Sequence, residues 1–115
     1  MNSDPRDHDD NSLTMHDVAG TWRSDEPGQP YLTFNDEGAA WGTDGCNGIN
    51  TSYTLEKSTI TIEPWIATAR ACLGVNDWLS MARFAEIHGD TMTVRDRNDD
   101  VIGTLIRSSE DVRKP

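Results

Sequence analysis

The sequence predicts a mainly β fold of the α+β class, a curled antiparallel β-sheet or small barrel of about eight strands with one short helix. Apolar and polar residues alternate with a period of two through most of the chain. Turn-forming residues separate these stretches about every eight to twelve residues. A single segment, residues 75–85, shows helical spacing instead.

Length and composition indicate a single domain. A chain of 115 residues can bury a core large enough to fold without disulfides or metal ions. We expect the folded domain over residues 18–107, a disordered acidic tail over 1–17 and a flexible C-terminal tail over 108–115. The first segment is rich in aspartate and poor in apolar residues, so it should not bury enough surface to offset its ordering entropy.

Five strands are expected before the helix, and each alternates apolar with polar side chains. They cover residues 18–22, 31–34, 39–43, 52–56 and 59–63. Val18, Gly20 and Trp22 share one face of the first strand. The turn after the second strand ends in Gly38, where a positive φ is easiest.

The helix is expected to run for about ten residues after Asn76, a favourable N-cap. Its apolar positions recur at helical spacing and are Val75, Trp78, Leu79, Ala82 and Ala85. Three strands should follow, with a turn at Gly89 between two of them. The last strand, over 101–107, carries apolar residues on both faces, which is typical of a central or covered strand.

Charge excludes two classes of partner. Acidic side chains number 20 against 10 basic ones, and the net charge is −10, which repels nucleic acid phosphates and anionic membrane surfaces. No apolar run approaches the roughly 20 residues of a membrane span. The first 17 residues lack the basic start and apolar stretch of a secretion signal. We therefore expect a cytoplasmic protein, or an envelope or periplasmic one if a signal has been removed.

Cys46 and Cys72 are the two cysteines of the chain, and each lies in a recognisable string. Cys46 stands between Gly45 and Asn47, and Cys72 ends the string that begins at Thr68. If oxidised, the pair would close a loop of about 25 residues and stabilise the fold by about 3.5 kcal/mol. We expect the two Cα atoms to lie within about 7 Å. A disulfide and a reduced pair both remain open, because cytosolic thiols stay reduced.

Together with Gly20, Trp22 and Tyr53, and taken in chain order, the two cysteine strings resemble the META domain family, which includes the heat-shock protein HslJ. The resemblance covers about residues 18–107 and rests on Gly20, Trp22, Gly45, Asn47, Tyr53 and Thr68 together with the cysteine pair. It implies a compact antiparallel β fold in a family of bacterial envelope or stress contexts, often lipoproteins, without an established enzymatic activity. The chain departs from the pattern at Ser52, where a glycine often precedes the tyrosine, and in lacking a lipid-anchor cysteine near its start.

Two chemical sites are conceivable from the residues, and the sequence argues against both. Cys46 could act as a nucleophile with His88 as its base and Asp90 as the orienting group, but structural thiols explain the cysteines better. Asp96, Asn98 and Asp100 match the first ligand positions of a calcium loop. That loop lacks the glycine and the glutamate that such a site needs further on. We therefore expect no enzyme, no cofactor and no metal.

Four tryptophans are many for this length, and they leave two functions open. Core packing is the default use of Trp22, Trp41, Trp65 and Trp78, but a ligand-lined cavity would use the same residues. The opening Gly20-Thr21-Trp22 is also similar to that of avidin-like and lipocalin-like barrels. The expected function is a non-enzymatic stress or envelope module, a monomer with an unidentified protein or small-molecule ligand. The alternative is a small-ligand carrier, which an interior cavity of about 300 Å³ or more would favour.

Overall fold

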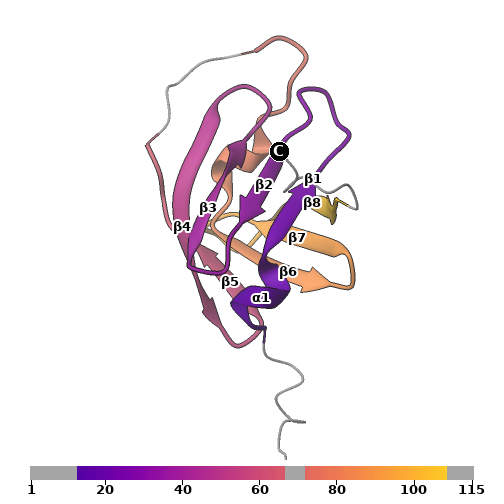
Figure 1. The fold of residues 1–115 in the computed structure, drawn as a ribbon. Coiled ribbons are helices and arrows are strands. Elements are labelled where there is room, and N and C mark those ends of the chain that lie inside the picture. Colours follow the sequence, from indigo (N-terminus) through magenta and orange to yellow (C-terminus); the bar gives the residue numbers. More distant parts are fainter. Residues whose placement is uncertain (1–12, 67–71, 109–115) are drawn as a thin grey trace, which may run out of the picture.

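Eight antiparallel strands close into a barrel in the computed structural model, which describes residues 13–66 and 72–108 (Figure 1). The strands are β1 (Gly20–Arg23), β2 (Tyr31–Phe34), β3 (Ala39–Thr43), β4 (Gly48–Glu56), β5 (Thr59–Ile62), β6 (Phe84–His88), β7 (Thr91–Arg95) and β8 (Val101–Arg107). The predicted fold class is confirmed, and of the two predicted forms the sheet takes the closed one.

Each strand pairs with its neighbours in the sequence, and β1 pairs with β8 to close the barrel. At this seam Trp22 lies opposite Arg107, and Arg23 lies opposite Ile106. β4 begins earlier than predicted, because its first residues pair with β3 directly after a short turn. Ser52 lies within β4 opposite Ala39, so the strand passes through this position regularly.

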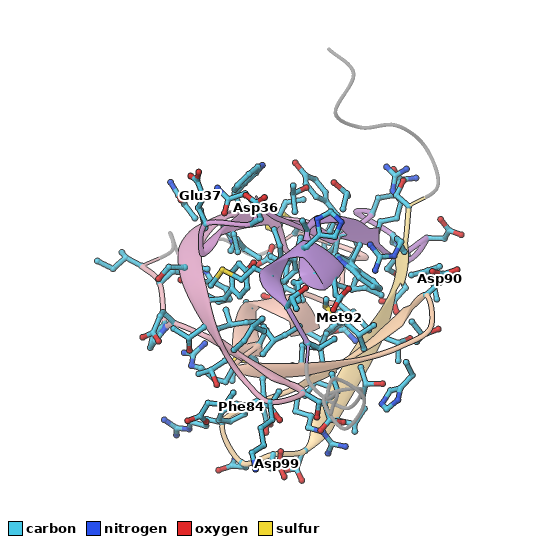
Figure 2. All side chains as sticks on the ribbon, turned by 60° about the horizontal axis from the view of Figure 1, so that its bottom comes forward. Asp36, Glu37, Phe84, Asp90, Met92 and Asp99 are labelled. Atoms are coloured by element: carbon cyan, nitrogen blue, oxygen red, sulfur yellow. A yellow bond between two sulfur atoms is a disulfide. The ribbon has the colours of Figure 1, made fainter. Side chains whose placement is uncertain are left out.

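The end of the barrel shown forward in Figure 2 is crossed by the helix α1 (Met15–Val18). The expectation of a disordered tail up to residue 17 is wrong for the residues described. Thr14 caps the helix, with Asp17 completing a capping box. The Leu13 amide donates to the Lys57 carbonyl oxygen at 2.9 Å. Val18, expected on the first strand, instead ends α1 fully buried.

Apolar contacts explain why this segment orders despite its acidic neighbours. Leu13 and Met15 pack against the buried core of the barrel, and the Trp22 indole donates to the Val18 carbonyl oxygen at 3.0 Å. The first residues of the chain are rich in aspartate, so composition alone predicted disorder. The two apolar side chains of Leu13 and Met15 nevertheless suffice to attach this segment to the core. Residues 1–12 and 109–115 of the predicted tails lie outside the described residues.

The predicted ten-residue helix is much shorter. Only Trp78–Met81 forms a helical turn, the 3₁₀-helix η2, and the chain turns to extended backbone at Ala82. Ala85 belongs to β6, where it pairs with Val94. Trp78, Leu79 and Ala82 are nevertheless buried as expected. The helical spacing arose because one helical turn and the following strand both direct small or apolar residues inward.

The barrel interior is filled by side chains from alternate strand positions. Trp22, Leu32, Ile60, Met92 and Leu105 are all 0% exposed. A cavity able to hold water would leave its lining side chains accessible, so none adjoins these five residues. None of the helices in residues 13–66 and 72–108 has the length and apolar character of a membrane-spanning segment.

The opposite end of the barrel is held by the disulfide between Cys46 and Cys72, whose Cα atoms are 5.8 Å apart. This confirms the predicted proximity, and the pair is oxidised in this structure. Cys46 lies in the turn between β3 and β4, and Cys72 lies in the connection between β5 and η2. Gly45 has a φ of +99°, and a Cβ there would lie 3.0 Å from Val75. The turn therefore needs glycine beside the bridged cysteine.

Candidate functional site

A groove of about 920 Å³ lies on the outer face of β1, β2 and β3. Alternation along each strand creates this face, because Trp22, Leu32 and Ala40 point inward and their neighbours point outward. The groove also reaches α1 and the turn between β2 and β3. Its lining includes His16, Thr21, Arg23, Tyr31, Thr33, Asn35, Asp36, Trp41 and Arg107.

The floor of the groove is a row of cross-strand neighbours. Thr21 lies opposite Thr33, and Thr33 lies opposite Trp41 on the other side of β2. Arg23 and Tyr31 form the next outward row. Tyr31 and Trp41 are thus diagonal neighbours, at a Cα separation of about 7–8 Å in a regular sheet, within reach of aromatic side chains.

Close approach of two strands sets the spacing of these aromatic residues. A Cβ at Gly42 would lie 2.0 Å from the carbonyl oxygen of Tyr31. Only glycine allows β3 to pass β2 at this distance. Gly42 directly follows Trp41, so the same contact fixes where Trp41 projects from the sheet.

Trp41 is the exposed aromatic residue of the groove. Its surface is 41% exposed, whereas Trp22 and Trp78 are buried. Within residues 13–66 and 72–108, neither the Trp41 indole nor the Tyr31 hydroxyl makes a hydrogen bond. Both side chains therefore offer an apolar ring and a polar group to a ligand, a combination that is enriched at binding surfaces.

The threonine pair adds polar groups to the groove. The Thr21 and Thr33 hydroxyl oxygens are 2.7 Å apart, and either can donate to the other. Two hydroxyls that share one hydrogen bond retain one donor and several lone pairs. Thr21 is only 6% exposed, so its hydroxyl sits deep in the floor.

Arg107 lines the groove next to the pairing of β1 with β8. Its guanidinium carbon lies 4.1 Å from the centre of the Trp22 ring. It donates to the Asp17 carbonyl oxygen at 2.9 Å and to the Ala19 carbonyl oxygen at 3.3 Å. Its Nε lies 3.5 Å from the Asp90 carboxylate. The Arg107 guanidinium therefore already has an anionic partner and two carbonyl acceptors within the protein.

The turn between β2 and β3 limits the other end of the groove. Figure 2 shows Asp36 and Glu37 of this turn on one side of α1 and Asp90 on the other. The Asn35 side chain accepts hydrogen bonds from the Glu37 and Ala39 amides, which holds the turn. The Tyr53 hydroxyl donates to the Asn35 carbonyl oxygen at 2.5 Å. Burial raises the pKa of Tyr53 above its usual value, and the Asp36 carboxylate raises it further.

Most residues of the predicted motif have structural roles. Trp22 stacks with Arg107, and Tyr53 meets Phe34 edge-on at 5.1 Å between ring centres. The Asn47 amide donates to the Asp44 carboxylate at 2.6 Å. Among the motif residues that the structure describes, Gly20 alone lines the groove. Thr68 lies outside the described residues.

The residues of the conceivable thiol site and calcium loop have structural roles instead. Cys46 is disulfide-bonded, so in this state it has no thiolate. The His88 side chain is 69% exposed and lies 3.7 Å from the Glu86 carboxylate. The Asp96 carboxylate accepts hydrogen bonds from the Asn98 and Asp100 amides, which makes this segment a hairpin turn.

Sequence reasoning missed the groove because it treated the tryptophans as one group. The alternation of Leu32 and Phe34 already directs Tyr31 and Thr33 outward. In the next strand, the small residues Ala40 and Gly42 flank Trp41. Small residues suit the crowded inside of a small barrel, so this pattern indicated an outward tryptophan.

Comparison with known proteins adds one match. The sequence model of the META domain family matches residues 9–109. No curated protein and no solved structure matches the chain. The matched region begins ahead of α1, so α1 lies inside the matched domain and the predicted start at residue 18 is too late.

Proposed function

The chain belongs to the META domain family, and from this membership we propose that it is a non-enzymatic binding module of the bacterial stress response or cell envelope. Its ligand binds the outer groove of β1, β2 and β3. The observation that carries this proposal is the contrast between the two faces of the sheet. The inward side chains are fully buried, while Trp41 and Tyr31 project outward into a groove of about 920 Å³. Such a volume suits a small ligand or a short chain.

The small-ligand carrier is the less favoured alternative. A carrier of the avidin or lipocalin kind needs space inside the barrel. Here the inward residues Leu32, Met92 and Val94 are 0% exposed. A ligand inside would have to displace these side chains, whereas the groove accepts one without rearrangement.

The disulfide supports a non-reducing compartment such as the periplasm. Disulfides persist in oxidising compartments and are rare in the cytosol. The 5.8 Å between the Cα atoms of Cys46 and Cys72 is an ordinary bridge geometry. This favours the envelope location among the two considered from the sequence.

A chemically diverse small-molecule library, screened by nuclear magnetic resonance on the oxidised protein, tests the proposed site. We expect shift changes at the Trp41 indole and the Thr33 methyl group. The methyl groups of Leu32 and Met92 act as interior controls and should not move. Shifts that cluster at the interior methyl groups would establish the carrier instead.

A further inference from the structure

We propose that the groove binds a neutral oligosaccharide, stacked on Trp41 and Tyr31 and hydrogen-bonded to the Thr21–Thr33 pair. This rests on the proposed function and names the chemical class of its ligand. Charge, ring placement and polar groups each point to this class.

Charge argues against an anionic ligand. The chain carries a net charge of −10, which opposes the approach of a polyanion. The Arg107 guanidinium in the groove is already paired with Asp90 and two backbone carbonyl oxygens. Arg23 is engaged in a contact of its own. The arginines therefore line the groove without providing an unpaired site for a ligand anion.

The aromatic residues argue for a ligand with flat apolar faces and polar edges. Trp41 and Tyr31 are diagonal neighbours on adjacent strands, so their rings lie on one outer surface. Each keeps a hydrogen-bond donor that has no partner among the described residues. The C–H faces of a sugar ring can cover the aromatic rings, while its hydroxyls meet the indole N–H and the phenol.

The groove floor supplies complementary hydroxyls. The Thr21 and Thr33 oxygens share one hydrogen bond of 2.7 Å and leave a donor and lone pairs for the ligand. A hydroxyl-rich ligand can satisfy both roles at once, whereas an apolar peptide would bury these groups unpaired. The groove also continues from this row to Asn35 and Asp36, which gives an extended chain room beyond one ring.

Titration of the oxidised full chain with cellohexaose, maltohexaose and the hexamer of N-acetylglucosamine tests the proposal. The four tryptophan indole resonances serve as the readout. We expect at least one of these sugars to shift the Trp41 indole saturably. The Trp22 indole, which is bonded to the Val18 carbonyl oxygen, should stay unchanged. An anionic oligogalacturonate of similar length should bind at least about tenfold more weakly.

Two variants and a matched control complete the test. Trp41→Ala should weaken sugar binding by at least about tenfold, and Thr33→Val should weaken it several-fold while keeping the side-chain shape. Trp65→Ala changes a partly buried tryptophan that stacks with Arg83 outside the groove, and it should bind like the unaltered protein. The Thr33→Val result keeps the test decisive if Trp41→Ala does not fold.

The outcomes separate the ligand class from the site. Equal binding by the unaltered protein and both groove variants, or tighter binding of the oligogalacturonate, would overturn the proposal. If no sugar shifts Trp41 but an apolar peptide or a library compound does, the sugar class is wrong and the groove remains a binding site. If compounds shift only residues elsewhere, the proposed function fails as well.

Discussion

The guanidinium carbon of Arg107 lies 4.1 Å from the centre of the Trp22 ring, at the seam where β1 meets β8. Trp22 is fully buried, and the Arg107 guanidinium lies over its ring. The same side chain binds the backbone of α1 at Asp17. One residue thus joins the first strand, the last strand and the helix across the barrel end.

Replacing Arg107 by glutamine should lower the free energy of unfolding by about 2 kcal/mol, because a partly buried cation–π contact and two hydrogen bonds are lost. The Asp90 pair should contribute little, since that carboxylate is 80% exposed. Urea unfolding measures the change. Arg97→Gln, in the exposed turn after β7, is the matched control and should change stability by less than about 0.5 kcal/mol. Equal effects of the two changes would contradict the role of Arg107.

Removing the disulfide with Cys46→Ser and Cys72→Ser should lower stability by about 3.5 kcal/mol, since the cysteines are separated by 26 residues. Urea unfolding of the double variant beside the oxidised protein gives the difference. Reducing the unaltered protein should produce a similar loss. Counting thiols in denatured protein before and after reduction checks the bridge itself. Finding two titratable thiols before reduction would rule out the disulfide.

The Gly42→Ala change should be strongly destabilising, by about 3 kcal/mol, because the new methyl group would overlap the Tyr31 carbonyl oxygen. Gly48→Ala is the control, since Gly48 starts the partner strand β4 and has nothing within 4 Å of the added Cβ. Thermal unfolding of both variants tests the difference. Comparable melting temperatures would show that β2 and β3 do not approach as closely as described.

Alkaline pH should destabilise the protein through Tyr53. The pKa of its phenol is raised above the usual 10.0, chiefly by burial. The unfolded chain therefore ionises first, so this contribution is complete below about pH 9 and is lost as the pH rises through the folded-state pKa. Urea midpoints at about pH 8 and pH 10.5 should differ more for the unaltered protein than for Tyr53→Phe. The Phe variant should itself be less stable at neutral pH, because the bond to Asn35 is gone.

Period-two patterning predicted most strands of this fold, and 31–34, 39–43 and 101–107 have the observed bounds. The inward and outward sets of a small barrel differ strongly in polarity, which makes this signal clear. The helix was overpredicted because periodicity cannot separate one helical turn from a following strand. α1 was missed because four helical residues carry little periodicity, and only its contacts with the core stabilise it.

The site was harder to predict than the fold. Motif residues such as Trp22 and Tyr53 stand out in the sequence, but they serve the interior. The groove residues Thr21, Thr33 and Trp41 are scattered along the chain and become a row only through strand register. Register depends on turn geometry, which composition does not reveal.

The order of the strands has a consequence for how the chain folds. Seven of the eight pairings join strands that follow one another in the sequence, so a meander can grow from one hairpin to the next. The remaining pairing joins β1 to β8, and Arg107 bonds to Asp17 across 90 residues of chain. Bringing together segments so far apart carries the largest loop-closure entropy, so it is expected to follow the local pairings. Trp22 and Arg107 should then have low φ-values, and weakening their contact should speed unfolding while leaving the folding rate nearly constant.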